Sequence, residues 1–218
     1  MRRPASMWSL ETLGRVRLSK YFYMRDMLHS EIGNFHGVPN VPDDPDLAIA
    51  AGRRLAVELL DPLHETFGCI AIRSAYRSAA LNAFGNERKL NCGGNEGNRG
   101  VHIWDLRDAE GHMGACACVV VPWFADQYEK GRDWRDLAWW VHDHLPYSQM
   151  LFFPNLAAFN LTWNEAPLRA IRSWIKPHHL VLRGGESPAE PPGQRRRRYT
   201  DFPPFRGVAQ PEIPARWA

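Results

Sequence analysis

The apolar run at residues 116–124 constrains the fold of this chain more than any other feature. It begins Cys-Ala-Cys-Val-Val-Val, and Pro122 ends the valines. Branched residues favour strands, and a proline removes the backbone donor that a central strand needs. The run is also far shorter than the ~20 apolar residues of a transmembrane helix. We therefore expect a buried strand over 116–121 and no membrane partner.

Charge is unevenly distributed along the 218 residues. The chain has 27 Lys and Arg against 24 Asp and Glu, a net charge of +3. Residues 184–218 hold six Arg and four acids, a net of +2, which leaves about +1 for the rest. A body with so little net charge is not typical of a nucleic-acid-binding protein. The run at 195–198 would give weak, salt-sensitive binding at most, so a nucleic-acid partner is not expected.

Three regions differ in composition. We expect a leader over 1–16, a domain over 17–183 and a tail over 184–218. Seven of the 17 prolines lie in the tail, which predicts a disordered segment or one that wraps a protein partner. The basic N-terminus lacks an apolar stretch, so we expect synthesis in the cytoplasm without a signal peptide. Work at the cell wall or in a virion would need another delivery route.

Helix signals are strongest after Asp44-Pro45, a capping residue followed by a proline at the first helical position. The apolar spacing predicts a helix over 45–66, bent near Asp61-Pro62 and ended by Gly68. The four cysteines are expected to be mostly buried, reduced thiols. Further patterns predict strands over 69–74, 101–104, 149–153 and 158–163, and helices from Ser78 and over 123–130, 133–144 and 166–175.

A set of motifs over residues 18–82 is more specific. In chain order they are Leu18-Ser19-Lys20-Tyr21-Phe22, Ser30-Glu31, Gly37-Val38-Pro39-Asn40-Val41-Pro42, Leu60-Asp61-Pro62-Leu63, Phe67-Gly68, Ile72-Arg73-Ser74-Ala75-Tyr76-Arg77-Ser78 and Leu81-Asn82. This set resembles the zinc D-alanyl-D-alanine carboxypeptidase-like peptidases of the hedgehog/DD-peptidase superfamily, in the short form common in phages and bacteria.

The resemblance implies an α+β fold: a small, mostly antiparallel sheet with helices packed on it and a Zn²⁺ cleft across it. It also implies a zinc-bound water, a carboxylate that takes its proton, and an arginine that stabilises the developing charge. Arg77 matches the arginine, although a structural salt bridge is the alternative. Ser74, Tyr76 and Asn160 would then bind substrate.

The metal ligands match the family only in part. The family pattern is Ser-x-His-x-x-Gly-x-Ala-x-Asp. One register places His102 at the histidine and, after an insertion, Cys118 at the aspartate. A second register uses His112 and puts Val119 there. The first is chemically better, because a thiolate binds zinc and a valine does not.

The third ligand position holds Asn160, a poor zinc ligand, where the family has histidine. Either a rearranged set of His102 and Cys118 with His112 or Asp105 binds zinc, or the site is dead. Glu165 is the candidate general base. Its alternative is a surface acid that precedes Pro167.

Two functions follow from the resemblance. The first is a zinc metallopeptidase, a DD-carboxypeptidase or endopeptidase that hydrolyses D-Ala-containing stem peptides of peptidoglycan. The second is a catalytically degenerate member of the same fold that serves as a cell-wall-binding or virion structural module. The altered ligands, the nine tryptophans and the Pro/Arg-rich tail favour the second, but the enzyme is the preferred interpretation of the sequence.

Overall fold

The computed structural model describes residues 1–182, 184 and 190–206. Within them the strands form one six-stranded sheet of order β1-β2-β4-β3-β5-β6. β3 and β5 are parallel, and the other neighbouring pairs are antiparallel. This confirms an α+β fold with a mostly antiparallel sheet. The strands are β1 (Ala71–Ser74), β2 (Gly114–Val120), β3 (Gln149–Phe152), β4 (Phe159–Asn164), β5 (Ala170–Ser173) and β6 (His179–Val181).

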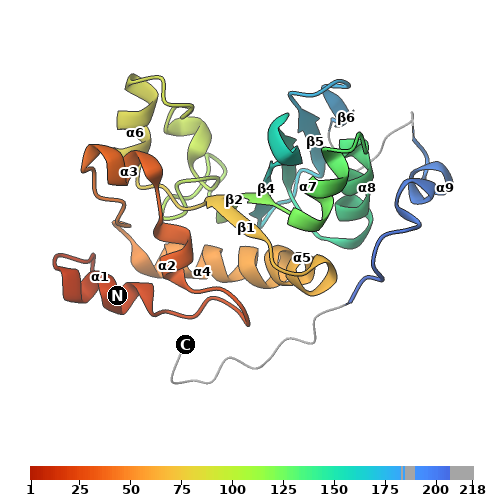
Figure 1. Cartoon of the computed structure of the whole chain (residues 1–218). Coiled ribbons are helices and arrows are strands. Elements are labelled where there is room, and N and C mark those ends of the chain that lie inside the picture. Colours follow the sequence, from red (N-terminus) through yellow and green to blue (C-terminus); the bar gives the residue numbers. More distant parts are fainter. Residues whose placement is uncertain (183, 185–189, 207–218) are drawn as a thin grey trace.

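A long helical segment runs beneath β1 and β2 (Figure 1). It consists of α4 (Pro45–Leu55), a π-helical turn η1 (Ala56–Leu60) and α5 (Asp61–Phe67). The Asp44 side chain caps its start by accepting from the Leu47 N–H, and Gly68 ends it at φ +84°. The predicted helix over 45–66 is confirmed. Its irregular turn directly precedes Asp61-Pro62, where proline supplies no N–H for the helical ladder.

The helices α4, α5 and α8 (Trp134–His144) pack on one face of the sheet. On β2 the alternate residues Ala115, Ala117 and Val119 face the main hydrophobic core. α8 covers the same face further along, where the Trp134 ring lies 4.9 Å from that of Phe152. The opposite face, here called the polar face, carries the polar or thiol side chains of Cys116, Cys118, Gln149, Asn160, Thr162 and Asn164. The apolar Leu151 and Val120 lie on the same face, and Cys118 packs in a small cluster with Val120.

Shorter helices complete the molecule. α3 and α6 lie together on one side of β1, and α7 lies near α8 on the other (Figure 1). Their bounds are α1 (Met7–Gly14), α2 (Met24–Leu28), α3 (Glu31–His36), α6 (Ala79–Glu87), η2 (Glu96–Asn98), α7 (Pro122–Tyr128), η3 (Asn155–Ala157), α9 (Pro192–Arg195) and η4 (Arg196–Tyr199).

Three local predictions differ from the structure. The expected leader over 1–16 contains α1, which Ser6 caps and which buries Leu13 in the core. The expected strand over 101–104 is a series of turns with a single bridge between Arg99 and Ile103. The expected helix over 166–175 contains β5, because this segment pairs with β3 through its backbone. Short segments such as these take their conformation from tertiary partners rather than from local propensity.

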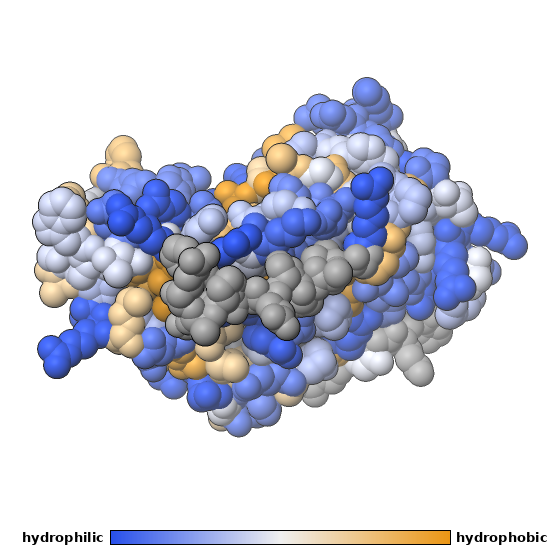
Figure 2. All heavy atoms as spheres, turned by 90° about the horizontal axis from the view of Figure 1, so that it is seen from below, coloured by the Kyte–Doolittle hydropathy of each residue, from blue (hydrophilic) through white to orange (hydrophobic). Residues whose placement is uncertain are grey.

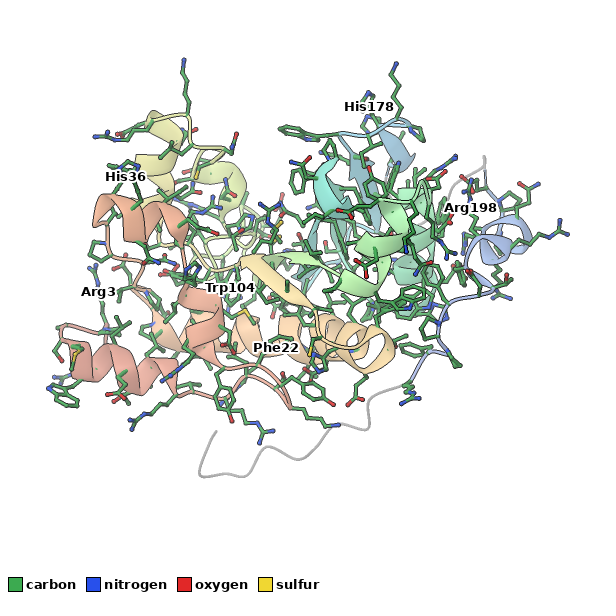
Figure 3. All side chains as sticks on the ribbon, viewed as in Figure 1. Arg3, Phe22, His36, Trp104, His178 and Arg198 are labelled. Atoms are coloured by element: carbon green, nitrogen blue, oxygen red, sulfur yellow. The ribbon has the colours of Figure 1, made fainter. Side chains whose placement is uncertain are left out.

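Part of the proline-rich tail packs on the domain. The Phe202 side chain is 8% exposed and lies against the rings of Phe67, Trp123 and Phe124. Arg198, labelled in Figure 3, forms an ion pair with Asp136 of α8. Residues 190–206 of the expected tail are thus placed against the domain, and the expectation that the tail wraps a partner stays a prediction. Residues 185–189 and 207–218 lie outside the described part of the chain.

Hydrophilic side chains dominate the face of the molecule in Figure 2, with apolar side chains between them. No helix in the described residues has the length and apolar character that a bilayer span requires.

Candidate functional site

Three predicted site residues form one row across the polar face. Ser74 of β1 lies opposite Cys118 of β2, and Cys118 lies opposite Asn160 of β4. The Cys118 side chain is 8% exposed, while Ser74 and Asn160 are half-buried. Paired positions of adjacent strands project to the same face, so the sheet itself brings these three residues together.

Arg77 lies just beyond the end of β1 and is half-buried. Its backbone N–H donates to the carbonyl oxygen of His102 at 2.8 Å, which fixes the two segments together. Its Nη1 donates to Asn82 Oδ1 at 3.0 Å and approaches Cys92 Sγ at 3.2 Å. Neither side-chain partner is a carboxylate.

Among the residues that the structure describes, no carboxylate forms an ion pair with Arg77 or with neighbouring Arg73. The alternative interpretation of Arg77 as half of a structural salt bridge therefore finds no support there. Both arginines act electrostatically on the Cys118 thiol, as does the carboxylate of Glu31 in the opposite sense. The end of the row beside β1 is thus predominantly cationic.

His102 lies in the loop before β2 and is 6% exposed. Its Nδ1 lies 2.8 Å from the carbonyl oxygen of Ala75, so Nδ1 is assigned as the protonated nitrogen that donates to this acceptor. Burial, reinforced by the charge of Arg77, lowers the pKa of His102 to about 4. The imidazole is therefore neutral at pH 7, with Nε2 unprotonated.

The two thiols of the polar face are also uncharged at neutral pH. Burial raises the pKa of Cys116 to about 12. Burial likewise raises the pKa of Cys118, although the charges of Arg73 and Arg77 pull it downwards. A protonated thiol is neither a nucleophile nor a metal ligand, and binding a metal would require its deprotonation.

The donors in the row do not fit the family's zinc shell. Residues 1–182, 184 and 190–206 contain no group of three His, Cys, Asp or Glu placed to hold a metal ion. Beside His102 the row offers one thiol, Cys118, and one amide, Asn160. Catalytic zinc sites use three strong protein donors, and an amide oxygen suits harder ions.

His112 is not brought to the row. It lies before β2, and its backbone N–H donates to Asp108 Oδ1 at 2.8 Å. β2 begins at Gly114, two residues after His112, and Cys118 lies four residues or about 13 Å further along the strand. The rearranged set of His102, Cys118 and His112 is therefore not assembled into one group in the described residues.

Glu165 is also distant from the row. It follows β4, five residues or about 17 Å beyond Asn160. Its Oε2 accepts from the Met113 N–H at 2.6 Å and from Arg107 Nη1 at 3.4 Å. These bonds tie the loop before β2 to the end of β4, so the geometry gives Glu165 a structural role and does not support the general-base prediction.

Tyr76 and Asp105 lie in the interior rather than on the polar face. The Tyr76 side chain is 1% exposed and packs edge-on against Trp104, at the centre of Figure 3. Its backbone N–H bonds to the Met27 carbonyl, so the chain has already turned from β1 towards α2. The side chain of Tyr76 therefore lies apart from the row, and its role in substrate binding stays a prediction. Asp105 accepts from the Asp43 N–H at 2.7 Å and links two loops.

Sequence reasoning missed the residues that hold Arg77 in place. Asn82 accepts from Arg77 and donates through Nδ2 to Gly93 O and Asn95 Oδ1, which anchors the Gly-rich loop. Cys92 in that loop completes the contact. The signal was present, because Asn82 belongs to the same motif set as Arg77, but its contact with the guanidinium depends on how the loop folds back.

Comparison with protein-family models, with curated proteins and with solved structures gave no match. The chemistry of the polar face must therefore be interpreted from its own residues. Within the described residues it combines two arginines without carboxylate partners, a neutral buried histidine and protonated thiols. Such a face is suited to bind an anion.

Proposed function

We propose that this chain is a non-catalytic, DD-peptidase-like module that binds the C-terminal carboxylate of a peptide at Arg77. The observation that carries the proposal is the half-buried guanidinium of Arg77, which donates to Asn82 and Cys92 and has no carboxylate partner among the described residues. Arginine is almost never fully buried without a partner. Here a ligand would supply it.

The guanidinium of Arg77 suits a carboxylate ligand. A guanidinium offers parallel N–H donors that match the two oxygens of a carboxylate, and such charge-assisted bonds are worth about 1.5–3 kcal/mol. Arg73 adds a second positive charge beside Cys118. Polar residues of the row, Ser74 and Asn160, lie where they could hydrogen-bond the peptide backbone.

The peptide class follows from the resemblance over residues 18–82. Its natural ligand would be a peptidoglycan stem peptide that ends in D-Ala, and the module would serve at the cell wall or in a virion. The chemistry of Arg77 accounts for binding of a carboxylate. The terminal position of that carboxylate and the D-configuration of the residue rest on the resemblance.

Calorimetric titration tests the proposal with an acetylated peptide ending in D-Ala-D-Ala, as the free acid and as the C-terminal amide. The acid should bind at least tenfold more tightly. Arg77→Gln should remove that difference, whereas Arg196→Gln, which alters an exposed arginine of the tail, should preserve it. Equal affinity of acid and amide for the wild-type chain would refute the role of Arg77.

A second candidate is the zinc peptidase. One observation favours it: the Nδ1–H of His102 bonds to the Ala75 carbonyl, as a metal-ligating histidine commonly does with its other nitrogen. Metal analysis after zinc loading tests it, with His102→Ala and Cys118→Ala as controls. Stoichiometric zinc that both variants lose, together with cleavage of the peptide, would establish this candidate in place of the first.

A further inference from the structure

A second polar site lies at the other end of the same strands. A cavity of about 320 Å³ opens where the loop over 99–112 meets the ends of β2, β3 and β4. Its polar lining includes Asp108, His112, Ser148, Gln149, Thr162 and Asn164, with the charged Arg99 and Glu110. Gln149, Thr162 and Asn164 belong to the polar face, so the cavity lies at one end of that face.

The cavity is built by close packing of the loop on the strand. A Cβ atom at Gly114 would lie 2.0 Å from the carbonyl oxygen of Gly100, so only glycine permits this approach. Asn164 Nδ2 donates to Asp108 Oδ2 at 3.0 Å and fixes the loop to the end of β4. The site is therefore formed before any ligand arrives.

Asp108 supplies an ionised carboxylate to this cavity. Its Oδ1 accepts from the backbone N–H groups of His112 and Glu110, at 2.8 and 3.1 Å. Partial burial raises the pKa of Asp108, but these bonds and the Asn164 amide outweigh it and hold the pKa below the usual range. The carboxylate is thus charged at neutral pH.

Few cations compete for that charge inside the cavity. Arg99, the arginine of the lining, pairs with Glu96 at 3.2 Å. The His112 Nδ1 lies 3.5 Å from Asp108 Oδ1, at the edge of hydrogen-bonding distance. Glu110 adds a second carboxylate to the lining. The remaining oxygens come from the buried hydroxyls of Ser148 and Thr162 and the amide of Gln149.

We infer that this cavity binds a primary ammonium group, such as the side-chain amine of a lysine or of another diamino acid. An ammonium donates three hydrogen bonds and accepts none, which suits a carboxylate surrounded by hydroxyl and amide oxygens. The volume lies in the lower part of the range for small-molecule sites.

The link between this cavity and a peptide rests on the proposed function. Gly114 and Cys118 lie about 13 Å apart along β2, the span of about four extended peptide residues. A peptide whose carboxylate reaches Arg77 would place an amine-bearing residue a few positions earlier in this cavity. Binding of the ammonium group alone does not depend on Arg77, so the ammonium site and the carboxylate site can be refuted independently.

The test uses the full chain, labelled with ¹⁵N, and two small probes at pH 7.5. The probes are Nα-acetyl-lysine N-methylamide and the norleucine analogue, which has the same chain without the amine. The lysine probe should shift the amide signals of residues 108–112 and 162–164 and bind at least tenfold more tightly. Equal binding of both probes, or shifts confined to other regions, would overturn the inference.

Variants make the test specific. Asp108→Asn should weaken the lysine probe at least tenfold, whereas Asp126→Asn, which alters an exposed acid of α7, should leave the affinity unchanged. Arg77→Gln should also leave it unchanged. If Asp108→Asn unfolds, Thr162→Val replaces it and should weaken the probe several-fold. Full affinity in a folded Asp108→Asn or Thr162→Val protein would contradict the assignment.

Discussion

Cys118 and Asn160 face each other across β2 and β4 on the polar face of the sheet. The family resemblance places an aspartate and a histidine of a zinc shell at these two positions. A thiol and an amide stand there instead, while the neighbouring Arg77 retains a charge without a carboxylate partner in the described residues. These two positions therefore separate the proposed anion-binding face from a metal site of the kind that the resemblance implies.

Restoring the family's ligands should create a zinc site. The double variant Cys118→Asp, Asn160→His would add a carboxylate and an imidazole to the row, and His102 has an unprotonated Nε2 to offer as a third donor. We expect about one zinc per chain in this variant and substoichiometric zinc in the wild type, measured by elemental analysis after loading and dialysis. Each single variant is the control and should bind more weakly. Stoichiometric zinc in the wild type would contradict the prediction.

The buried His102 should make stability fall with acid. Its folded pKa of about 4 lies below the unfolded value of 6.5, so its contribution is complete above pH 6.5 and is lost as pH falls towards 4. The difference corresponds to about 3 kcal/mol at 1.36 kcal/mol per pKa unit.

Urea denaturation at pH 7 and pH 4 measures this effect. His102→Asn keeps a donor for the Ala75 carbonyl but cannot titrate, so its stability should fall less over the same interval. Identical pH dependence in both proteins would mean that His102 titrates normally in the folded state.

The tail should contribute to the stability of the domain through one aromatic anchor. Phe202 is buried among core rings, so Phe202→Ala should lower the free energy of unfolding by about 3 kcal/mol. Phe205 lies three positions further along the chain and is 40% exposed, so Phe205→Ala serves as the control and should cost less than about 1 kcal/mol. Equal effects in guanidinium unfolding would show that Phe202 is not anchored in the core in solution.

Substitutions in the arginine run 195–198 should differ in their effect on stability, because some of these arginines form buried ion pairs and others are exposed. Arg195 pairs with Asp143 of α8 at 2.6 Å, and both side chains are largely buried. Arg195→Ala should therefore destabilise the protein by about 2 kcal/mol, because it leaves a buried carboxylate with one partner fewer. Arg196→Ala removes the same charge from an exposed position and should change stability by less than about 0.5 kcal/mol. Thermal unfolding of the two variants compares them, and a reversed order would contradict the contacts.

The regular part of the fold could be predicted because its signals are local. The cap at Asp44, the apolar spacing of α4 and α5, and the valines of β2 each act within a few residues. β5 could not be predicted, since its four residues become a strand by parallel pairing with β3. The packing of 190–206 was missed for a similar reason: its acidic and aromatic partners lie on α5, α7 and α8.

The candidate site was predictable only in part. The motif resemblance supplied Arg77, Ser74, Cys118 and Asn160, and strand pairing brings the last three together. His112 and Glu165 were plausible by residue type, but their distances along β2 and β4 separate them from the row. The partners of Arg77 depend on a loop whose course no local pattern specified.

The most direct test of the central claim is a titration of the D-Ala-D-Ala acid peptide into metal-free and zinc-loaded wild-type protein, with a mass spectrum of the peptide afterwards. An anion-binding module at Arg77 predicts the same dissociation constant in both states and an intact peptide. Binding that requires zinc, or a peptide shortened by its terminal residue, would contradict it.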